Sequence, residues 1–215
     1  MLNDILIKKT IAASEQVVIC VPTSGMVHAM FTFCLINAIR YTESQGIPVV
    51  LEMDAGTVLS NQRQVLSDMA VNAHAAEHIM WLDSDMTFPE DVIIKLLEHK
   101  KKVVCATYSK RVPPFHPTAF YNINPVEPVN TEDHGLVTVR YSGMGCMLVH
   151  TSVFDAMPSP HYPLTWHAPS STWHGEDMGF CELLEDNSIK LFCDLDLSRE
   201  IGHLGQREFR VNQAN

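Results

Sequence analysis

The chain has 215 residues, of which 46% are hydrophobic and 19% charged, and its formal net charge is −10. This length and composition fit one soluble globular domain, and no apolar run is long enough to span a membrane. The acidity argues against a non-specific nucleic-acid binder, because such proteins neutralise phosphates with clustered cations.

Strand-like and helix-like segments alternate through the first half of the chain. Short apolar runs predict strands at residues 16–21, 47–53, 79–82 and 102–107. Residues 22–25 and Ser60 are the expected caps of the first two intervening helices. The side chains expected to face the core are Val27, Met30, Phe31, Cys34, Leu35, Ala38 and Ile39 in the first helix and Val65, Leu66, Met69, Ala70 and Ala73 in the second. This alternation predicts a parallel sheet with right-handed crossovers.

The pattern changes after Tyr108. Antiparallel strands are expected at residues 118–123 and 136–141, and Gly143 and Gly145 precede another strand, where they would serve a bulge or the close approach of a ligand. A long, mobile loop is expected at 158–172 and a helix after Gly175, with Phe180, Cys181 and Leu184 inward. A last strand at 189–194, an irregular segment at 195–205 and a frayed tail from 206 complete the prediction.

An acidic turn follows the central strand. Asp83 and Asp85 come directly after the apolar run, and Pro89, Glu90 and Asp91 precede the next helix. Glu90 and Asp91 already supply the acids that stabilise the N-terminal end of the next helix. Asp83 and Asp85 are therefore not needed for capping. Ligands bind at the carboxyl ends of strands in such sheets, and two carboxylates there can hold a divalent cation and through it a diphosphate. No Gly-rich dinucleotide or Walker motif is present.

Four short motifs in this order carry a resemblance to a known family. They are Pro22-Thr23, Asp83-Ser-Asp85, Gly175-Glu-Asp177 and His203-Leu-Gly205. Over residues 15–205 the chain resembles a small, family-2-like GT-A glycosyltransferase of the kind found in bacteriophages and bacteria. The resemblance implies one α/β domain over 1–215, a Rossmann-like, mostly parallel sheet flanked by helices, with a smaller antiparallel C-terminal part. Residues 15–107 would bind the nucleotide-sugar, 108–205 would form the acceptor and catalytic half, and 206–215 a tail.

The resemblance also implies roles for individual residues. Mn²⁺ or Mg²⁺ would be held by Asp85 and His203, with Asp83 reaching a metal-bound water or the ribose. Asp177, or its neighbour Glu176, would be the general base that accepts the proton of the acceptor hydroxyl. The donor-binding residues that the resemblance implies are Pro22, Thr23, Asp54, Arg63, Asp83, Lys110 and Arg111.

The resemblance and the composition indicate the class of donor and the expected compartment, but they do not identify the acceptor. The donor expected is a nucleotide-diphospho-sugar, with a UDP-sugar preferred. The acceptor stays open among saccharide, lipid, protein and a modified DNA base, and the oligomeric state is open as well. Residues 1–10 lack a signal-peptide core, and six cysteines without a Cys-x-x-Cys pattern read as reduced core residues. A cytoplasmic protein is therefore expected, in the host cytoplasm if a phage encodes it.

Other interpretations of the same residues stay open. A nucleotidyltransferase would use the same acids, although its usual Gly-rich, Lys-bearing loop is missing here. A non-catalytic sugar-nucleotide-binding protein is a further alternative, but it would have no use for Glu176-Asp177. His74-x-x-Glu77-His78 matches an inverted zinc-protease pattern, but it also fits a helix end followed by a strand. The histidines of the 158–174 region are expected to be exposed loop residues, or else part of a lid in which Trp166 or Trp173 stacks on a sugar.

Overall fold

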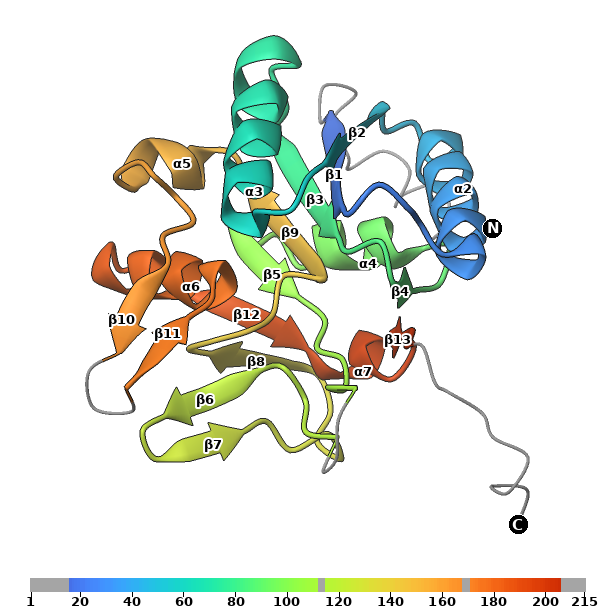
Figure 1. Ribbon diagram of the computed structural model, residues 1–215. Helices are drawn as coiled ribbons and strands as arrows, with labels where there is room; N and C mark the ends of the chain where they lie inside the picture. The colour runs from blue at the N-terminus through green and yellow to red at the C-terminus, as the bar shows by residue number, and fades with distance from the viewer. Residues whose placement is uncertain (1–15, 112–114, 168–170, 206–215) are drawn as a thin grey trace, which may run out of the picture.

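The computed structural model describes residues 16–111, 115–167 and 171–205. Within these ranges a seven-stranded sheet forms the centre of the protein, in the order β2-β1-β3-β9-β5-β12-β8 (Figure 1). Its strands are β1 (Val17–Thr23), β2 (Val49–Ala55), β3 (His78–Leu82), β5 (Val103–Cys105), β8 (Leu136–Val139), β9 (Cys146–His150) and β12 (Leu191–Asp194). The expectations for residues 1–10 and 206–215 lie outside the described ranges.

The sheet is mostly parallel, as predicted. β1 pairs in parallel with β2 and β3, and β5 with β12, whereas β9 runs antiparallel between β3 and β5 and β8 runs antiparallel beside β12. All strands except β8 and β9 therefore point the same way. Because β8, β9 and β12 follow residue 108, both halves of the chain contribute to one sheet.

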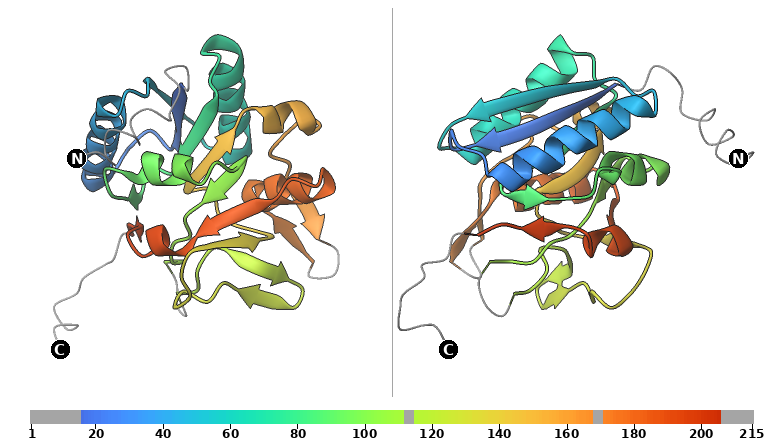
Figure 2. Two further views of the ribbon diagram at one scale, coloured as in Figure 1. Left: turned by 180° about the vertical axis from the view of Figure 1, so that it is seen from behind. Right: turned by 90° about the vertical axis from the view of Figure 1, so that its right-hand side faces the viewer.

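Helices cover both faces of the sheet (Figure 2). Alternate strand residues enter two cores: Ile19 packs with α2 and α4, whereas Cys20 packs with α3 and α6. Strands buried on both faces read as continuous apolar runs, which is why the sequence reveals them. The helices are α2 (Ala29–Ser44), α3 (Leu59–Asp68), the π-helix η1 (Met69–Ala73), α4 (Val92–Glu98), α5 (Ser152–Ala156), α6 (Glu176–Asp186) and α7 (Leu195–Ser198). None of these described helices is long and apolar enough to cross a membrane.

Three small antiparallel pairs complete the described structure. β4 (Met86–Thr87) pairs with β13 (Gly202–His203), β6 (Phe120–Ile123) with β7 (Val126–Pro128), and β10 (Thr165–His167) with β11 (Thr172–His174). The expectation of an irregular 195–205 segment is therefore wrong, because α7 and β13 lie within it. The loop expected at 158–172 likewise contains β10 and the start of β11, while residues 168–170 lie outside the described structure.

The side chains of the first two helices that face the core differ from those predicted. α2 begins at Ala29, four residues after the expected cap, and its N-cap is His28, whose Nδ1 accepts a hydrogen bond from the Met30 amide. Val58 rather than Ser60 precedes α3. Among the side chains predicted to face the core, those that prove exposed are Val27, Met30, Val65, Met69 and Ala73. In α3 the buried positions are taken instead by Gln62, Arg63 and Ser67, polar side chains with specific partners.

Gly143 and Gly145 leave room for the ring of Tyr108. A Cβ atom added to them would lie 2.5 Å and 2.7 Å from the Tyr108 hydroxyl oxygen. That oxygen accepts a hydrogen bond from the Gly145 amide at 3.1 Å. The two glycines thus let the Tyr108 ring pass beneath the entry to β9. Of the six cysteines, all free, five are buried and Cys34 is half-buried.

Stability should decrease in mild acid because of one buried histidine. His78 of β3 is paired in register with His150 of β9, and the ring centroids lie 4.9 Å apart. Burial, and then the neighbouring His150, lower the pKa of His78 from 6.5 to about 4. Between these values the unfolded chain binds a proton that the folded chain does not, so stability falls as pH falls from 6.5 towards 4.

We expect this histidine to remove about 2 kcal/mol of unfolding free energy between roughly pH 7.5 and pH 5. Urea unfolding at both pH values measures it in the wild type and in His78→Gln. The variant should lose less stability on acidification by about that amount. Equal losses in the two proteins would show that His78 does not carry the effect.

Candidate functional site

A buried arginine connects the central acidic turn to the start of α6. Arg63 of α3 is 1% exposed, and its Nη2 donates to Asp83 Oδ1 at 2.9 Å while its Nε donates to Glu176 Oε1 at 3.3 Å. The guanidinium also lies over the Trp81 ring, 5.2 Å from its centroid. Burial acts to lower the pKa of Arg63, but the charges of Asp83 and Glu176 outweigh it and raise that pKa. The cation is therefore permanent.

One nitrogen of this guanidinium remains unused. Nη1 of Arg63 is buried and has no hydrogen-bond partner among the described residues. Most buried donors in proteins are paired, so an unpaired donor on a permanent buried cation calls for an explanation. Arg63 thus keeps one donor that its bonds to Asp83 and Glu176 do not use.

Asp85 and His203 meet through the short β4–β13 pairing. His203 lies opposite Met86 in that pair, and the Leu204 amide donates to the backbone oxygen of Asp85 at 2.7 Å. These bonds place His203 Nε2 3.5 Å from Asp85 Oδ2. Arg111 reaches the same carboxylate oxygen, with Nη1 at 2.7 Å, and it is half exposed. One carboxylate therefore faces an imidazole and a guanidinium that come from distant parts of the chain.

Backbone contacts set the orientation of the His203 ring. Its Nδ1–H donates to the Ser109 carbonyl at 2.9 Å, and the ring packs edge-on to Tyr108. Nε2 therefore faces Asp85, the arrangement that a metal-ligating histidine needs. The hydrogen bond to Asp85 raises the pKa of His203. Burial acts to raise the pKa of Asp85, but the hydrogen bond from His203 and the charges of His203 and Arg111 lower it overall.

These residues fit a metal ion that a substrate shares. Asp85 and His203 offer one carboxylate and one imidazole, and the described residues contain no group of three or more side chains able to hold a metal. Metals that bind nucleotides take one or two protein ligands and complete their shell with phosphate oxygens and water. Asp85 and His203 are therefore the two side chains here that could serve as the protein's share of such a shell.

Asp177 is the acid whose environment favours its protonated form. It lies in the first turn of α6, and its Oδ1 accepts the Met178 amide at 2.8 Å. Burial, followed by the charge of Glu176, raises the pKa of Asp177 despite that bond and the nearby Arg63. A Cβ at Gly175 would lie 2.8 Å from Asp177 Oδ1, so any other residue there would make the Asp177 carboxylate shift. A carboxylate with a raised pKa is more basic than an ordinary aspartate.

Gln62, which the sequence did not single out, joins the ends of β1 and β2. Its Nε2 donates to the Thr23 carbonyl at 2.9 Å and to the Asp54 carbonyl at 2.6 Å. Pro22, Thr23 and Asp54 therefore lie together at the carboxyl edge of the sheet. Gln62 is the neighbour of Arg63, and both face inward on α3, so the polar pair is the signal that could have indicated the site.

Other candidate residues lie elsewhere or have other partners. The Lys110 ammonium lies over the Phe120 ring, 5.2 Å from its centroid, whereas Arg111 reaches Asp85. His161 and His174 are buried, so the exposed loop expected for them is wrong. The zinc interpretation fails on geometry, because His78 lies in a strand, and His74 lies before it and pairs with Glu52 at 2.6 Å.

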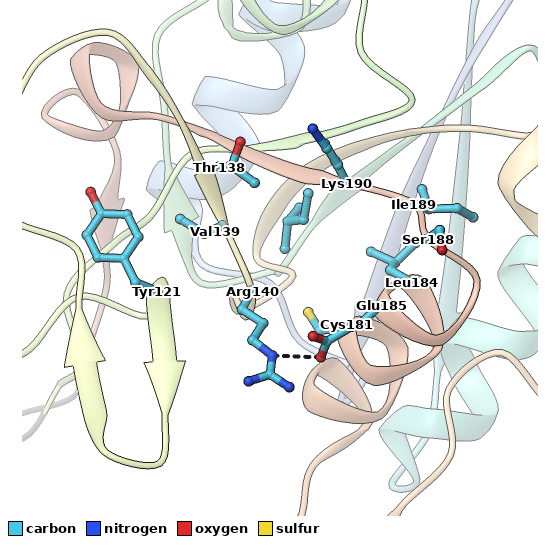
Figure 3. Close-up of a pocket in the computed structure, with 11 residues that line it drawn as sticks. Tyr121, Thr138, Val139, Arg140, Cys181, Leu184, Glu185, Ser188, Ile189 and Lys190 are labelled. Carbon is cyan, nitrogen blue, oxygen red and sulfur yellow. Dashed lines mark hydrogen bonds and ion pairs between the residues drawn. The ribbon is translucent and has the colours of Figure 1, made fainter.

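A separate pocket of about 380 Å³ lies at the far end of α6 (Figure 3). Its wall includes Cys181 and Leu184 of α6, Thr138 of β8, and the Arg140–Glu185 ion pair, whose atoms are 2.6 Å apart. None of the predicted site residues lines it. The pocket therefore does not belong to the site built around Asp83 and Asp85.

Comparisons with known proteins support the fold. No protein-family model and no curated protein match the chain. The chain is similar to the crystal structure of the protein A197 from STIV, with a TM-score of 0.55 and 13% identity over 91% of this chain and 97% of that one. It is also similar to a Drosophila beta-1,4-galactosyltransferase 7 mutant in complex with manganese, UDP-Gal and xylobiose, with a TM-score of 0.53 and 10% identity over 93% and 78% of the two chains. The fold is thus GT-A-like, as the resemblance implied.

Proposed function

We propose that this protein is a metal-dependent glycosyltransferase that moves a sugar from a nucleotide-diphospho-sugar, with UDP as the favoured nucleotide, to an acceptor hydroxyl. The observation that carries the proposal is that His203 and Arg111 both reach the Asp85 carboxylate, at 3.5 Å and 2.7 Å. Asp85 is two residues from Asp83, which is bound to Arg63 and through it to Glu176. The similarity to a galactosyltransferase crystallised with manganese and UDP-Gal supports it.

Asp85 and His203 would hold Mn²⁺ or Mg²⁺ together with the donor diphosphate. The bound ion would act as a Lewis acid that stabilises the negative charge of the leaving diphosphate. Arg111 now pairs with Asp85, and because it is half exposed it can turn to the diphosphate when a cation takes its place. It would then add fixed positive charge where negative charge develops.

The nucleoside would lie over the ends of β1 and β2. Pro22, Thr23 and Asp54 are at this edge, held together by Gln62. The carboxylate of Asp83, which is 27% exposed and oriented by the buried Arg63, would offer an acceptor to ribose or sugar hydroxyls. Lys110, which lies over Phe120, is a weaker candidate for donor binding than Arg111.

Asp177 is the better candidate for general base of the two acids at the start of α6. Glu176 is already engaged by Arg63, whose Nε lies 3.3 Å from its Oε1, whereas the pKa of Asp177 is raised by burial and by Glu176. A base is most effective when its pKa approaches the working pH. Asp177 would accept the proton of the acceptor hydroxyl as the hydroxyl oxygen attacks the anomeric carbon.

The two other interpretations explain less of the geometry. A non-catalytic sugar-nucleotide-binding protein has no use for a buried aspartate with a raised pKa, because such a group reduces stability when ionised. A nucleotidyltransferase would need cations around the attacked phosphate in the loop after β1, and residues 22–28 contain neither Lys nor Arg. Sugar transfer is therefore preferred.

Metal-dependent donor binding tests this proposal. UDP with Mn²⁺ at about 100 times its Kd should raise the melting temperature by roughly 5–10 °C, and UDP with EDTA should not. Asp85→Asn and His203→Ala should abolish the metal-dependent shift. Asp196→Asn is a matched control, because Asp196 also pairs with a histidine and an arginine, His134 and Arg199. A shift that persists in EDTA, or in both site variants, would refute the assignment.

A further inference from the structure

Two exposed tryptophans face each other on the β10–β11 hairpin. Trp166 and Trp173 are directly paired in register, with ring centroids 5.5 Å apart and planes at 67°. They are 53% and 68% exposed. Large exposed aromatic side chains grouped in this way are unusual on a protein surface unless a ligand or partner covers them.

The hairpin is anchored on the face opposite to these rings. The neighbouring pair in the ladder is Thr165 and His174, and both bond to Glu182 of α6, His174 Nδ1 at 3.0 Å and Thr165 Oγ1 at 3.1 Å. His174 is buried and stacks on His167. Side chains alternate between the two faces of a strand, so this anchoring turns the tryptophan pair away from the core. The rings are therefore held in place without being part of the packing.

The hairpin leads directly into the proposed catalytic helix. β11 ends at His174, and α6 begins at Glu176 with Asp177 next to it (Figure 1). Because Trp173 precedes Glu176 by only three residues, a molecule that extends from the tryptophan rings along the hairpin can reach the N-terminal turn of α6. This is where an acceptor hydroxyl must lie if Asp177 is the base.

The charge of the sequence around the hairpin indicates what kind of molecule would lie on the two tryptophans. Residues 151–189 contain no Lys and no Arg, and they contain Asp155, Glu176, Asp177, Glu182, Glu185 and Asp186. Single-stranded nucleic acids also stack on aromatic rings, but they need a cationic groove along their backbone. An uncharged saccharide needs no cations, offers C–H faces to the rings, and offers hydroxyl donors to carboxylates.

We propose that Trp166 and Trp173 form the platform for an uncharged saccharide acceptor. The acceptor role rests on the proposed transferase function, whereas binding of the saccharide to the platform does not. This excludes the modified DNA base from the acceptors that the sequence left open. The platform would place one sugar hydroxyl near Asp177 and leave the rest of the saccharide in solvent.

Saturation-transfer NMR on the full chain tests the platform without any donor. The probes are xylobiose, cellobiose, maltose and lactose, with an oligothymidylate as the polyanion. We expect saturation to reach the ring protons of at least one disaccharide and not the oligonucleotide. The signal should fall about tenfold in Trp166→Ala/Trp173→Ala. It should survive in Leu164→Ala, which removes an exposed apolar side chain, 53% exposed, beside the same hairpin.

A phenylalanine pair at the two positions distinguishes stacking from structural support. Trp166→Phe/Trp173→Phe keeps two aromatic faces and should retain most of the signal. Three results would each overturn the platform: saturation that reaches no disaccharide, saturation undiminished in the alanine double variant, or binding of the oligonucleotide through the two tryptophans. If the platform binds a disaccharide but no nucleotide-sugar is turned over, the transferase proposal fails and the platform remains.

Discussion

Asp177→Asn should reduce sugar transfer by about 10²- to 10⁴-fold while donor binding remains. The amide keeps the shape of the side chain and can still accept the Met178 amide hydrogen bond, but it cannot take up a proton. Initial-rate assays of transfer, with Mn²⁺-dependent UDP binding measured in parallel, separate the two effects. The loss should appear in kcat and not in the KM of the donor.

The same substitution should slightly stabilise the fold. Burial and Glu176 raise the pKa of Asp177, so its ionised form at neutral pH weakens the folded state, and the neutral amide removes that cost. Asp186→Asn, at the exposed C-terminal end of the same helix, is the matched control for activity and should leave sugar transfer unchanged. Transfer that survives in Asp177→Asn, or donor binding lost along with transfer, would argue against Asp177 as the base.

Arg63→Met should cost about 3–5 kcal/mol of unfolding free energy. Arg63 is 1% exposed, and removing its charge leaves Asp83 and Glu176 half-buried without their shared cation. Breaking a buried ion pair from one side is strongly destabilising because the remaining charge stays desolvated. Urea unfolding at neutral pH measures the difference.

An exposed ion pair provides the control for Arg63. Arg140 and Glu185 are each about half exposed, and their charged atoms lie 2.6 Å apart. Arg140→Met should cost less than about 1 kcal/mol, because water screens such pairs and solvates the remaining charge. If Arg63→Met proves as mild as Arg140→Met, then Arg63 does not hold the acidic turn and α6 together.

The features that could be predicted from sequence are those with a local physical cause. A strand buried on both faces must be apolar along its length, so β1, β3 and β5 appear as apolar runs. The acids after β3 are visible because they exceed what helix capping needs. Gly175-Glu-Asp177 is visible because acids favour the first turn of a helix.

The contacts that position the site residues depend on partners distant in sequence, so local patterns do not show them. Arg63 binds Asp83 and Glu176, which are 20 and 113 residues away, so no local pattern shows that an arginine should face inward. The two-residue strands β4 and β13 are too short to have any periodicity, yet their pairing brings His203 to Asp85. The place of β9 between β3 and β5 also depends on tertiary pairing.

Donor turnover in the absence of an acceptor is the most direct test of the transferase proposal. The protein is incubated with UDP-, GDP-, TDP- and CMP-sugars, each with Mn²⁺ or with EDTA, and the released nucleotide is assayed. We predict metal-dependent release from one donor, lost in Asp85→Ala and in His203→Ala and retained in Asp196→Asn. If no donor releases nucleotide in a metal-dependent way, or if both site variants release it as fast as the wild type, the site proposed around Asp85 and His203 is contradicted.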